Sequence, residues 1–363
     1  MKIEQYPVII EGSVKNVREV TEPTETQMGE YLLEFTDDTS VKDRGKLGFK
    51  TPNKGASMCA TAVNNFAELD AMGIPHVFKE QVADNAILVD AVRVINPDEH
   101  DLRGDRKNRL FPVEVITRDV VTDTSSAAKR LRSGTLHYSA LGLSEQPTDF
   151  PVFLPKTFVD GSTKLRNTGD DYLPWDQLKE LACATTEDMN TVQAYVLQTT
   201  ALAQRRGSEI GFLVFDHKDE YAYDADGRLV LADVPLCLDE VTGALVGPYT
   251  SLDQLNTGSF GIFRAGLTHE GHVNASKQLF RDHYDACHPE WCAAVKTALG
   301  AGVPKSQLPT VSQPPEELIG LVSNIYQAFT NEWTGVRTFD VPSLVQCVQD
   351  YRTWAVNFYE LKP

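Results

Sequence analysis

One predicted β-hairpin carries carboxylates and a lysine at a spacing that suits phosphate or metal chemistry. Asp216, Lys218 and Glu220 alternate along an apolar segment, so their side chains face one side of a strand. Asp233 follows on the next segment, beyond an Asp-Gly turn signal. Carboxylates on adjacent strands can converge on Mg²⁺, which takes oxygen ligands and shares them with nucleotide phosphates. A ladder of surface ion pairs would use the same residues, and the spacing leaves both interpretations open.

A second candidate site lies near the N-terminus. Gly12 and Lys15 belong to a predicted strand, turn and strand, and Arg18 adds another cation. A glycine lets backbone amides approach a phosphate, and a lysine supplies positive charge. Ordinary surface hairpins also contain glycine and lysine, so these residues alone favour a structural turn.

Two further segments combine hydroxyl groups with charge. TDDTSVKDRGK (36–46) follows a predicted strand, where loops often carry binding groups, although a solvated turn is slightly favoured. Arg118 follows another apolar strand and precedes TDTSSAAKRL (122–131), whose hydroxyls and cations stand near a predicted helix start. A helix start attracts anions. Simple capping explains the same serines and threonines.

Histidines and cysteines gather before and within one predicted helix. His283 and Cys287 would share a helix face, and the same stretch holds His269, His272, His288 and Cys292. A zinc site is one interpretation, but ligand pairs at finger-like spacing are absent from the sequence. We therefore favour ordinary helix and loop residues.

Composition excludes several classes of protein. The chain has 363 residues, 42% of them hydrophobic, which is enough for two compact lobes. A net charge of −17 argues against a nucleic-acid binder. The sequence shows no apolar run of the roughly 20 residues that a membrane helix needs, and no signal peptide. We therefore expect a cytoplasmic protein that binds no membrane, and six cysteines without a CxxC pair are expected to stay reduced in that compartment. Whether it forms a homo-oligomer is left open.

The pattern of elements predicts an α+β protein. Short strands and one helix ending at Gly73 fill the first hundred residues, two more strands lie at 86–95 and 111–121, and 144–175 reads as a long loop. A helix at 187–206 precedes the hairpin, and helices follow residue 275. We divide the chain into an antiparallel lobe (1–113), a larger α/β lobe (114–300), and a Pro-rich connector with C-terminal helices (301–363).

These motifs occur in an order that resembles the SAICAR synthetase family. The order is GSVK, FTDDTS, TPNKG, a helix ending in GIP, FPVEVITR, KRL, DHKDE and DGRLVLAD. SKQLFRD (276–282) and PPEELIGLVSNIYQAFTNEWTG (314–335) are similar to the end of the longer members. The resemblance covers roughly residues 8 to 335, and its specificity lies in the series.

The resemblance implies both a fold and a reaction. The fold would be ATP-grasp-like, with two lobes and a C-terminal helical extension. The reaction would be an ATP- and Mg²⁺-dependent ligation of aspartate to a carboxylated aminoimidazole ribonucleotide, through an acyl phosphate, in purine biosynthesis. The partners would therefore be small molecules.

The resemblance also implies roles for single residues. Lys218, with Asp216, would be catalytic and would reach toward the reacting phosphate and carboxylate. Those implied in ATP binding are Gly12, Lys15, Glu220 and Asp233, the last two also holding Mg²⁺. Those implied in substrate binding are Asp38, Thr39, Ser40, Arg118, Thr124, Ser125, Ser126, Lys164, Asp170 and Arg264.

The sequence departs from the family pattern in several places. Ser13 stands where the glycine loop usually has a lysine, which removes one phosphate cation. Asp123 puts a carboxylate close to an expected phosphate, which weakens binding unless Asp123 turns away. The family's HDEN loop is here Gly-Asp-Asp at 169–171.

The largest departure follows the hairpin. The family reads DE and then SPDSSR, whose arginine helps to bind the ribonucleotide, but no arginine follows Asp233 at that spacing. Either Asp239-Glu240 is the true acidic pair, or Arg264 or Arg281 substitutes for the arginine. Two alternatives therefore remain beside SAICAR synthesis: a divergent ligase with another carboxylated acceptor, and an inactive binding or scaffold protein. Retention of the hairpin residues argues against the scaffold.

Overall fold

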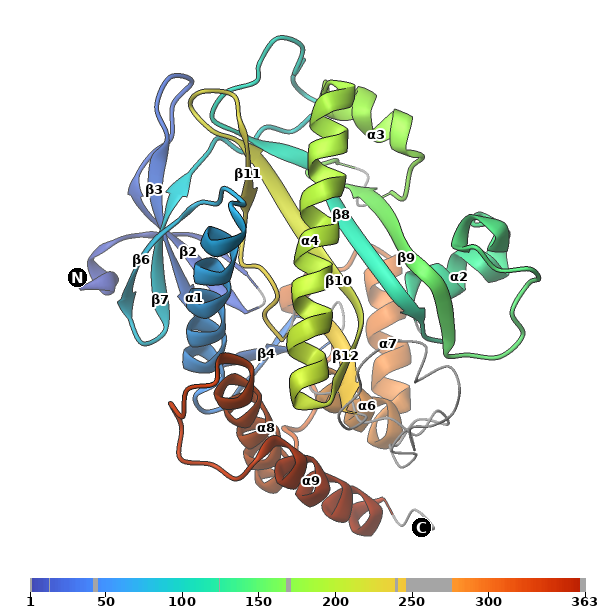
Figure 1. Ribbon diagram of the computed structural model, residues 1–363. Helices are drawn as coiled ribbons and strands as arrows, with labels where there is room; N and C mark the ends of the chain where they lie inside the picture. The colour runs from blue at the N-terminus through green and yellow to red at the C-terminus, as the bar shows by residue number, and fades with distance from the viewer. Residues whose placement is uncertain are drawn as a thin grey trace.

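Two antiparallel sheets flanked by helices make up this computed structural model (Figure 1). The structure describes residues 2–12, 14–41, 45–123, 125–167, 171–238, 241–245 and 276–359. Within these ranges, no helix is long and apolar enough to cross a membrane. The mixed architecture agrees with the predicted α+β class, while the domain boundaries at 113 and 300 stay predictions.

The first sheet is formed by the N-terminal part of the chain. Its strands, in spatial order, are β1 (Val8–Glu11), β2 (Lys15–Thr21), β3 (Gly29–Phe35), β7 (Ala86–Ala91) and β6 (Phe78–Ala83). A separate two-stranded ribbon joins β4 (Asp38–Ser40) to β5 (Lys46–Lys50). All neighbouring strands are antiparallel.

Helix α1 (Lys54–Met72) packs against β3 and β7 of this sheet. Met58, Ala62 and Phe66 recur every four residues and are buried, so one face of the helix enters the core. The helix ends where predicted, because Gly73 takes a left-handed conformation (φ 71°) and its N–H donates to the Asp70 and Leu69 carbonyls.

The second sheet holds the predicted hairpin. Its strands, in spatial order, are β11 (Leu229–Ala232), β10 (Phe212–Tyr223), β8 (Arg109–Val121) and β9 (Val152–Thr163). Strand β12 (Val241–Leu245) pairs with the first half of β10. The Asp-Gly turn is confirmed, since Gly227 has φ 79° and its Cβ position would lie 3.1 Å from the Arg106 carbonyl oxygen.

Strand β9 corrects the prediction of a loop over 144–175. Residues 152–163 form an edge strand, in a segment whose proline, glycine and aspartate content is typical of loops. Between Phe153 and Phe158 the ladder with β8 shifts register, and Pro155 falls in this irregularity. A proline without an N–H is tolerated there, because no ladder hydrogen bond is required of it.

Helix α4 (Thr186–Ile210) covers one face of the second sheet, along β8 and β10 (Figure 1). It begins with a capping box, in which Thr185 and Asp188 satisfy each other's backbone N–H, and it ends at Gly211. The short helices α2 (Ser126–Ser133) and α3 (Trp175–Ala182) flank β8 and β9.

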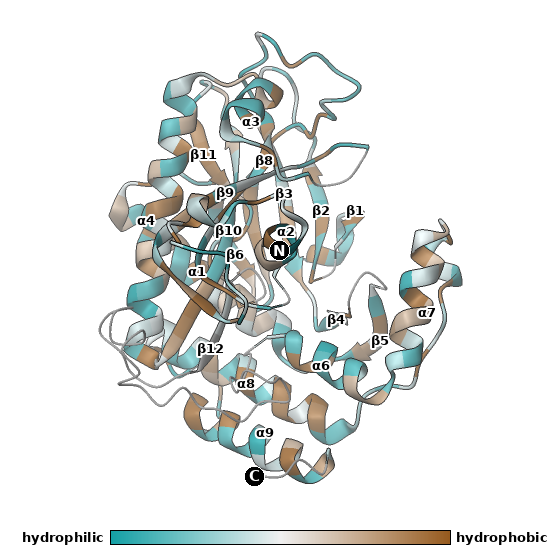
Figure 2. Cartoon of the chain, turned by 90° about the vertical axis from the view of Figure 1, so that its right-hand side faces the viewer, coloured by the Kyte–Doolittle hydropathy of each residue, from teal (hydrophilic) through white to brown (hydrophobic). Residues whose placement is uncertain are grey.

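The C-terminal part of the chain is helical, as predicted. Its helices are α6 (Gln278–Cys287), α7 (Pro289–Gly300), α8 (Glu316–Thr334) and α9 (Leu344–Phe358). Helix α8 packs against both α1 and α9, and Figure 2 shows α8 and α9 side by side with alternating apolar and polar faces. Short 3₁₀ turns lie at Ile3–Gln5, Tyr138–Leu141 and Lys305–Gln307.

Candidate active site

A cluster of lysines and carboxylates lies where β8 and β10 run side by side. The register places Glu220 directly opposite Glu114. Lys218 Nζ lies 3.1 Å from Glu114 Oε1 and 3.0 Å from Glu220 Oε1. Lys164, just after β9, forms ion pairs with the same two carboxylates. Carboxylates that face each other across strands repel, so the two lysines stabilise this pairing.

Burial affects the protonation of one carboxyl group in this cluster. It raises the pKa of Glu114 above its ordinary value, although Lys218 acts in the opposite direction. Asp216 and Lys218 contact the β8 side chains Arg118 and Glu114, and Lys218 also contacts Glu220, so the predicted common face of β10 is confirmed.

The two sheets meet at an ion pair between Lys15 on β2 and Asp233 after β11. Burial acts to raise the pKa of Asp233, but Lys15, followed by Lys164 and Lys218, outweighs it and lowers the pKa to about 2. Asp233 and Glu220 also line one hollow, together with Lys218 and the residues from Leu231 to Pro235. The hollow is therefore lined by the second sheet, and Lys15 of the first sheet reaches its edge through the ion pair with Asp233.

Gly12 shapes the turn before Lys15. Its N–H donates to the Lys15 carbonyl at 2.9 Å, and a Cβ added to Gly12 would lie 2.5 Å from that oxygen. Only glycine fits this close approach. Contact between Gly12 and a phosphate stays a prediction.

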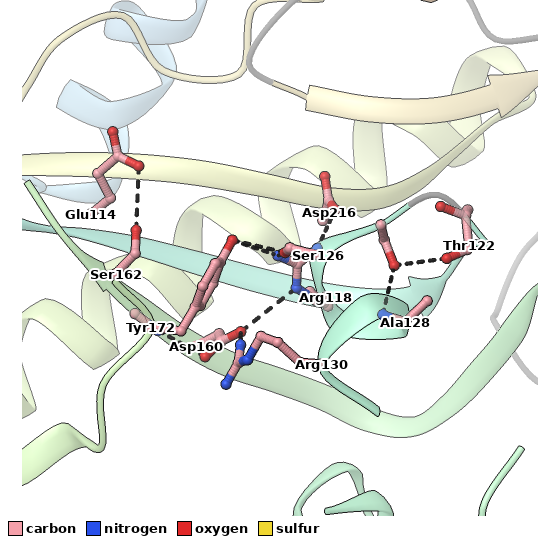
Figure 3. A network of polar contacts seen from close by, with 12 residues as sticks. Glu114, Arg118, Thr122, Ser126, Ala128, Arg130, Asp160, Ser162, Tyr172 and Asp216 are labelled. Carbon is pink, nitrogen blue, oxygen red and sulfur yellow. Dashed lines mark hydrogen bonds and ion pairs between the residues drawn. The ribbon is translucent and has the colours of Figure 1, made fainter. Parts of the chain in front are cut away.

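Arg118 is the centre of a second polar group on β8, shown in Figure 3. Its side chain is only 4% exposed, and its guanidinium lies 2.6 Å from Asp216 Oδ2 and 2.7 Å from Ser126 Oγ. The hydroxyl of Tyr172 lies 3.3 Å from Arg118 and 2.8 Å from Ser126. A buried cation, two hydroxyls and the first turn of α2 thus come together, which suits an anion.

A second arginine joins this group through a shared carboxylate. Arg130 lies 2.5 Å from Asp160 Oδ2, Arg118 Nε lies 3.8 Å from the same oxygen, and the Arg130 guanidinium covers the Tyr172 ring at 4.2 Å. Asp160 is nearly buried. It therefore holds two guanidinium groups beside each other, where like charges would otherwise repel.

The segment from Asp38 to Ser40 lies on the β4–β5 ribbon. Asp38 is paired with Lys46 at 3.0 Å and with Lys50, and Thr39 shares a 3.0 Å hydrogen bond with Thr51. Burial acts to raise the pKa of Asp38, but the two lysines outweigh it and lower that pKa. This carboxylate is thus ionised, and its own ribbon supplies its counter-charges.

The sequence model of the SAICAR synthetase family matches residues 8–239, well over half of the chain. The chain belongs to the SAICAR synthetase family. A protein of Archaeoglobus fulgidus assigned as a phosphoribosylaminoimidazole-succinocarboxamide synthase is 27% identical over 361 residues, covering 94% of this chain and 98% of its own length. A synthase of the same name from Deinococcus radiodurans is 26% identical over 223 residues, 61% of this chain and 78% of its own.

Solved structures of the SAICAR synthetase family share this fold. The SAICAR synthase of Saccharomyces cerevisiae, determined with SAICAR, has a TM-score of 0.63 and 19% identity, covering 92% of this chain and 97% of its own. The family recognised from the motif order is confirmed. The chain is therefore an ATP-dependent ligase that forms an amide bond in purine biosynthesis.

Asp123, one of the departures from the family pattern, has its own counter-ion. Its carboxylate pairs with Arg132 of α2, and Arg132 also donates to the Asp123 carbonyl at 2.9 Å. The side chain is 56% exposed. The expected repulsion of a phosphate is thus offset by a cation beside it.

Sequence reasoning missed Glu114, Arg130, Asp160 and Tyr172. Glu114 could have been found, because it is a carboxylate within an otherwise apolar strand and stands four residues before Arg118, on the same face. Asp160 and Tyr172 could not, because their segment reads as a loop. Arg130 was noted only as part of KRL.

Several predicted residues cannot be placed in this site. Ser125 caps α2, accepting from the Ala128 N–H at 3.2 Å, which is the structural role that its position also predicted. Ser13, Thr124, Gly169, Asp170, Arg264 and the pair Asp239-Glu240 lie outside the described residues.

The oxygen donors of the described residues decide whether Mg²⁺ fits this site. Within the described part of the chain, no group of three histidine, cysteine or acidic side chains could hold a metal ion. Glu220 and Asp233 line the same hollow and offer the oxygen donors that Mg²⁺ takes. The pair therefore fits Mg²⁺ that completes its coordination with phosphate oxygens, as nucleotide-bound Mg²⁺ does.

The histidines and cysteines considered for zinc pack as ordinary helix residues where the structure describes them. His283 Nδ1 contacts the Tyr359 hydroxyl at 2.6 Å, and Cys287 Sγ lies 3.8 Å from the same nitrogen. Burial lowers the pKa of His283 to about 4. His269 and His272 lie outside the described residues, and the rest of the group agrees with ordinary helix packing.

Proposed function

We propose that this chain joins aspartate to the carboxylated aminoimidazole ribonucleotide, with ATP bound between the two sheets in an ATP-grasp-like arrangement. The observation that carries the proposal is the meeting of Lys15 and Asp233, from different sheets, beside the Lys218 cluster. Three lysines and three carboxylates neutralise one another there. An entering phosphate group exchanges carboxylate partners for phosphate oxygens without leaving a lysine unpaired.

In this proposal, Lys15 and Lys218 bind the phosphate groups of the reaction. Phosphoryl transfer depends mainly on positioning and on neutralising the charge of the transferred group. Lys15 neutralises the ATP phosphates, and Lys218 reaches the phosphate and the ribonucleotide carboxylate. When bound, Mg²⁺ at Glu220 and Asp233 neutralises phosphate charge.

The ribonucleotide phosphate is bound by Arg118, Arg130 and Ser126. Two guanidinium groups and a hydroxyl form donors suited to a phosphate dianion. Arg130 also replaces the arginine that is missing after Asp233. Asp160 contacts both guanidinium groups and so holds Arg130 beside Arg118. The described contacts favour Arg130 over Arg281, whose guanidinium donates to Gln278 on its own helix.

Glu114 serves the second half of the reaction. The ribonucleotide carboxylate attacks the terminal phosphorus of ATP and displaces ADP, which leaves an acyl phosphate; the aspartate amine then attacks the acyl carbon and expels phosphate. The amine loses a proton as the amide forms. Glu114 accepts that proton, because burial raises its pKa above that of an ordinary glutamate. Asp216 orients Arg118 from the neighbouring strand.

A turnover assay tests the proposal. The protein with ATP, Mg²⁺, aspartate and the carboxylated ribonucleotide is expected to release ADP and phosphate in step with amide formation. Omitting aspartate should stop phosphate release at a single turnover or below. Steady ATP hydrolysis that does not depend on the ribonucleotide, or no turnover at all, would contradict the proposed acceptor.

A further inference from the structure

The segment that presents Asp233 has an unusual backbone. Asp233 and Leu236 both adopt positive φ, 70° and 55°, a region that disfavours side chains larger than glycine. Leu236 is fully buried. Such a conformation persists only where surrounding contacts determine it.

The buried side-chain amide of Asn65 fixes this backbone conformation. Asn65, on α1 and 1% exposed, donates from Nδ2 to the carbonyl oxygens of Pro235 at 2.9 Å and Leu236 at 3.3 Å. In an extended strand successive carbonyls point in opposite directions, so one amide could not reach both. The turned backbone after Asp233 and the position of Asn65 therefore depend on each other.

The C-terminal helix α8 fixes Asn65 in turn. Trp333, fully buried, donates its indole N–H to Asn65 Oδ1 at 2.8 Å. This bond determines which end of the amide is the oxygen, and so directs Nδ2 at the two carbonyls. Trp333 lies outside the residues that the family model matches, yet it is two hydrogen bonds from the Asp233 segment.

The Trp333 bond belongs to a polar seam between α8 and α1. Ser323 donates to the Pro52 carbonyl at 2.6 Å, Gln327 accepts from Asn53 at 3.1 Å, and Thr330 donates to the Ser57 carbonyl at 3.0 Å. These positions recur at three or four residues and so share the face that carries Trp333. Among the described bonds of the seam, the Trp333 bond is the one that reaches Asn65 and, through it, the Asp233 segment.

We propose that Asn65 and Trp333 are positioning residues for ATP binding, which hold the backbone that presents Asp233. The inference rests on the proposed role of Asp233 at the ATP phosphates. Neither residue contacts the hollow itself. Their effect is expected on nucleotide affinity and not on aspartate binding.

The test compares variants by calorimetric titration of ATP with Mg²⁺, without aspartate or ribonucleotide. Asn65→Ala is expected to raise the Kd for ATP about tenfold, the order that one buried hydrogen-bonding group is worth. Trp333→Phe keeps an aromatic side chain but loses the indole N–H together with part of the ring system, and a smaller rise in the same direction is expected. In the double variant the two effects should not add, because both act through one amide.

Thr330→Val is the matched control. It removes the buried contacts of Thr330 with Ser57 and Thr61, neither of which involves Asn65, so it should lower the melting temperature and leave the Kd for ATP unchanged. Equal changes in the Kd for ATP in Thr330→Val and Asn65→Ala would show that Asn65 acts only through the packing of α8 on α1. An unchanged Kd in Trp333→Phe and Asn65→Ala would overturn the proposal.

The experiments distinguish a wrong positioning role for Asn65 and Trp333 from a wrong acceptor substrate. A wild-type chain that binds ATP without amide formation would contradict the proposed acceptor while leaving the positioning role testable. If Asn65→Ala does not fold, Trp333→Phe alone decides the question. The KM for aspartate should be unchanged in every folded variant.

Discussion

At the scale of single residues, the candidate site is a balance of charges that ligands can rearrange. Lys218 contacts both Glu114 and Glu220, while Lys164 pairs with Glu220 and Lys15 pairs with Asp233. Because each lysine has a carboxylate partner, the cluster is stable without a ligand. The same arrangement places three cations where a phosphate would enter.

Lys218 is expected to be the residue whose loss affects catalysis most. Lys218→Ala should lower kcat by roughly 10²–10³-fold, the range for removing one donor that stabilises transition-state charge. Measured kcat with an unchanged circular dichroism spectrum tests this. Lys296→Ala, on the exposed side of α7, is the matched control and should keep full activity. Near-normal activity of Lys218→Ala would remove Lys218 from the mechanism.

Asp233 should make stability depend on pH. Its pKa falls from 3.8 to about 2 in the folded chain, since Lys15, Lys164 and Lys218 outweigh the effect of burial. A carboxyl with a lowered folded-state pKa stabilises above its unfolded pKa, and that contribution is lost as the pH falls through the folded pKa. Asp233→Asn should therefore cost on the order of 2 kcal/mol at pH 7.

The pH dependence itself separates this effect from packing. The difference in free energy of unfolding between wild type and Asp233→Asn should shrink between pH values of about 4 and 2. Urea unfolding at pH 7 and pH 3 measures it. A difference that does not change with pH would mean that the ion pair with Lys15 is not its cause.

At the scale of elements, the reverse face of β10 is tied to α4 by buried polar groups. Thr199 donates to Asp219 Oδ2 at 2.6 Å and lies 3.0 Å from His217 Nε2, while Thr117 of β8 lies 2.8 Å from His217 Nδ1. His217 and Asp219 alternate with Lys218, so the strand presents the cluster on one face and this network on the other.

Loss of one hydroxyl should loosen α4 from the sheet. Thr199→Val keeps the shape but leaves Asp219 and His217 short of a partner, at a cost of about 1–3 kcal/mol in the free energy of unfolding. Chemical denaturation measures it. Thr191→Val, on the exposed face of the same helix, should cost little. Equal costs for the two variants would show that helix propensity, and not the buried network, is responsible.

Two glycines should respond to alanine with opposite signs. Gly320 lies within α8, and a Cβ there would meet no atom of the described residues within 4 Å, so Gly320→Ala should stabilise by about 0.5–1 kcal/mol. Gly227 has φ 79° in the hairpin turn, so Gly227→Ala should destabilise by about 1 kcal/mol or more. Thermal unfolding of both variants tests this, and the same sign for both would contradict it.

At the scale of the whole molecule, the C-terminal helices belong to the main hydrophobic core. Val322, Ile325 and Phe329 of α8 are buried in the same cluster as residues of both sheets. Each fully buried side chain of this kind contributes roughly 1.5–3 kcal/mol. Three of them approach the total stability of a typical domain, about 5–15 kcal/mol.

Deleting these helices should therefore unfold the catalytic part. A chain ending at residue 313 is expected to lose cooperative thermal unfolding and to bind a hydrophobic dye. Proteolytic cleavage at a site engineered beside the exposed Gln313 of the full chain is the control, because the helices stay packed after the cut. Cooperative unfolding of the shortened chain would contradict this role of α8.

Much of this architecture could be predicted from local sequence patterns. The end of α1 at Gly73 and the Asp-Gly hairpin follow from backbone preferences of single residues, and the shared face of Asp216, Lys218 and Glu220 follows from strand geometry. The order of motifs determined the family. Strand β9 escaped prediction, because its proline lies in a register shift that only the neighbouring strand defines.

The partners of those residues were decided by the tertiary structure alone. Glu114 meets Lys218 because β8 and β10 pair in one register, and Asn65 meets Trp333 across 268 residues because α8 packs on α1. Local patterns state which side of a strand or helix a residue occupies. Which distant residue stands opposite depends on strand register and helix packing, which are properties of the folded chain as a whole.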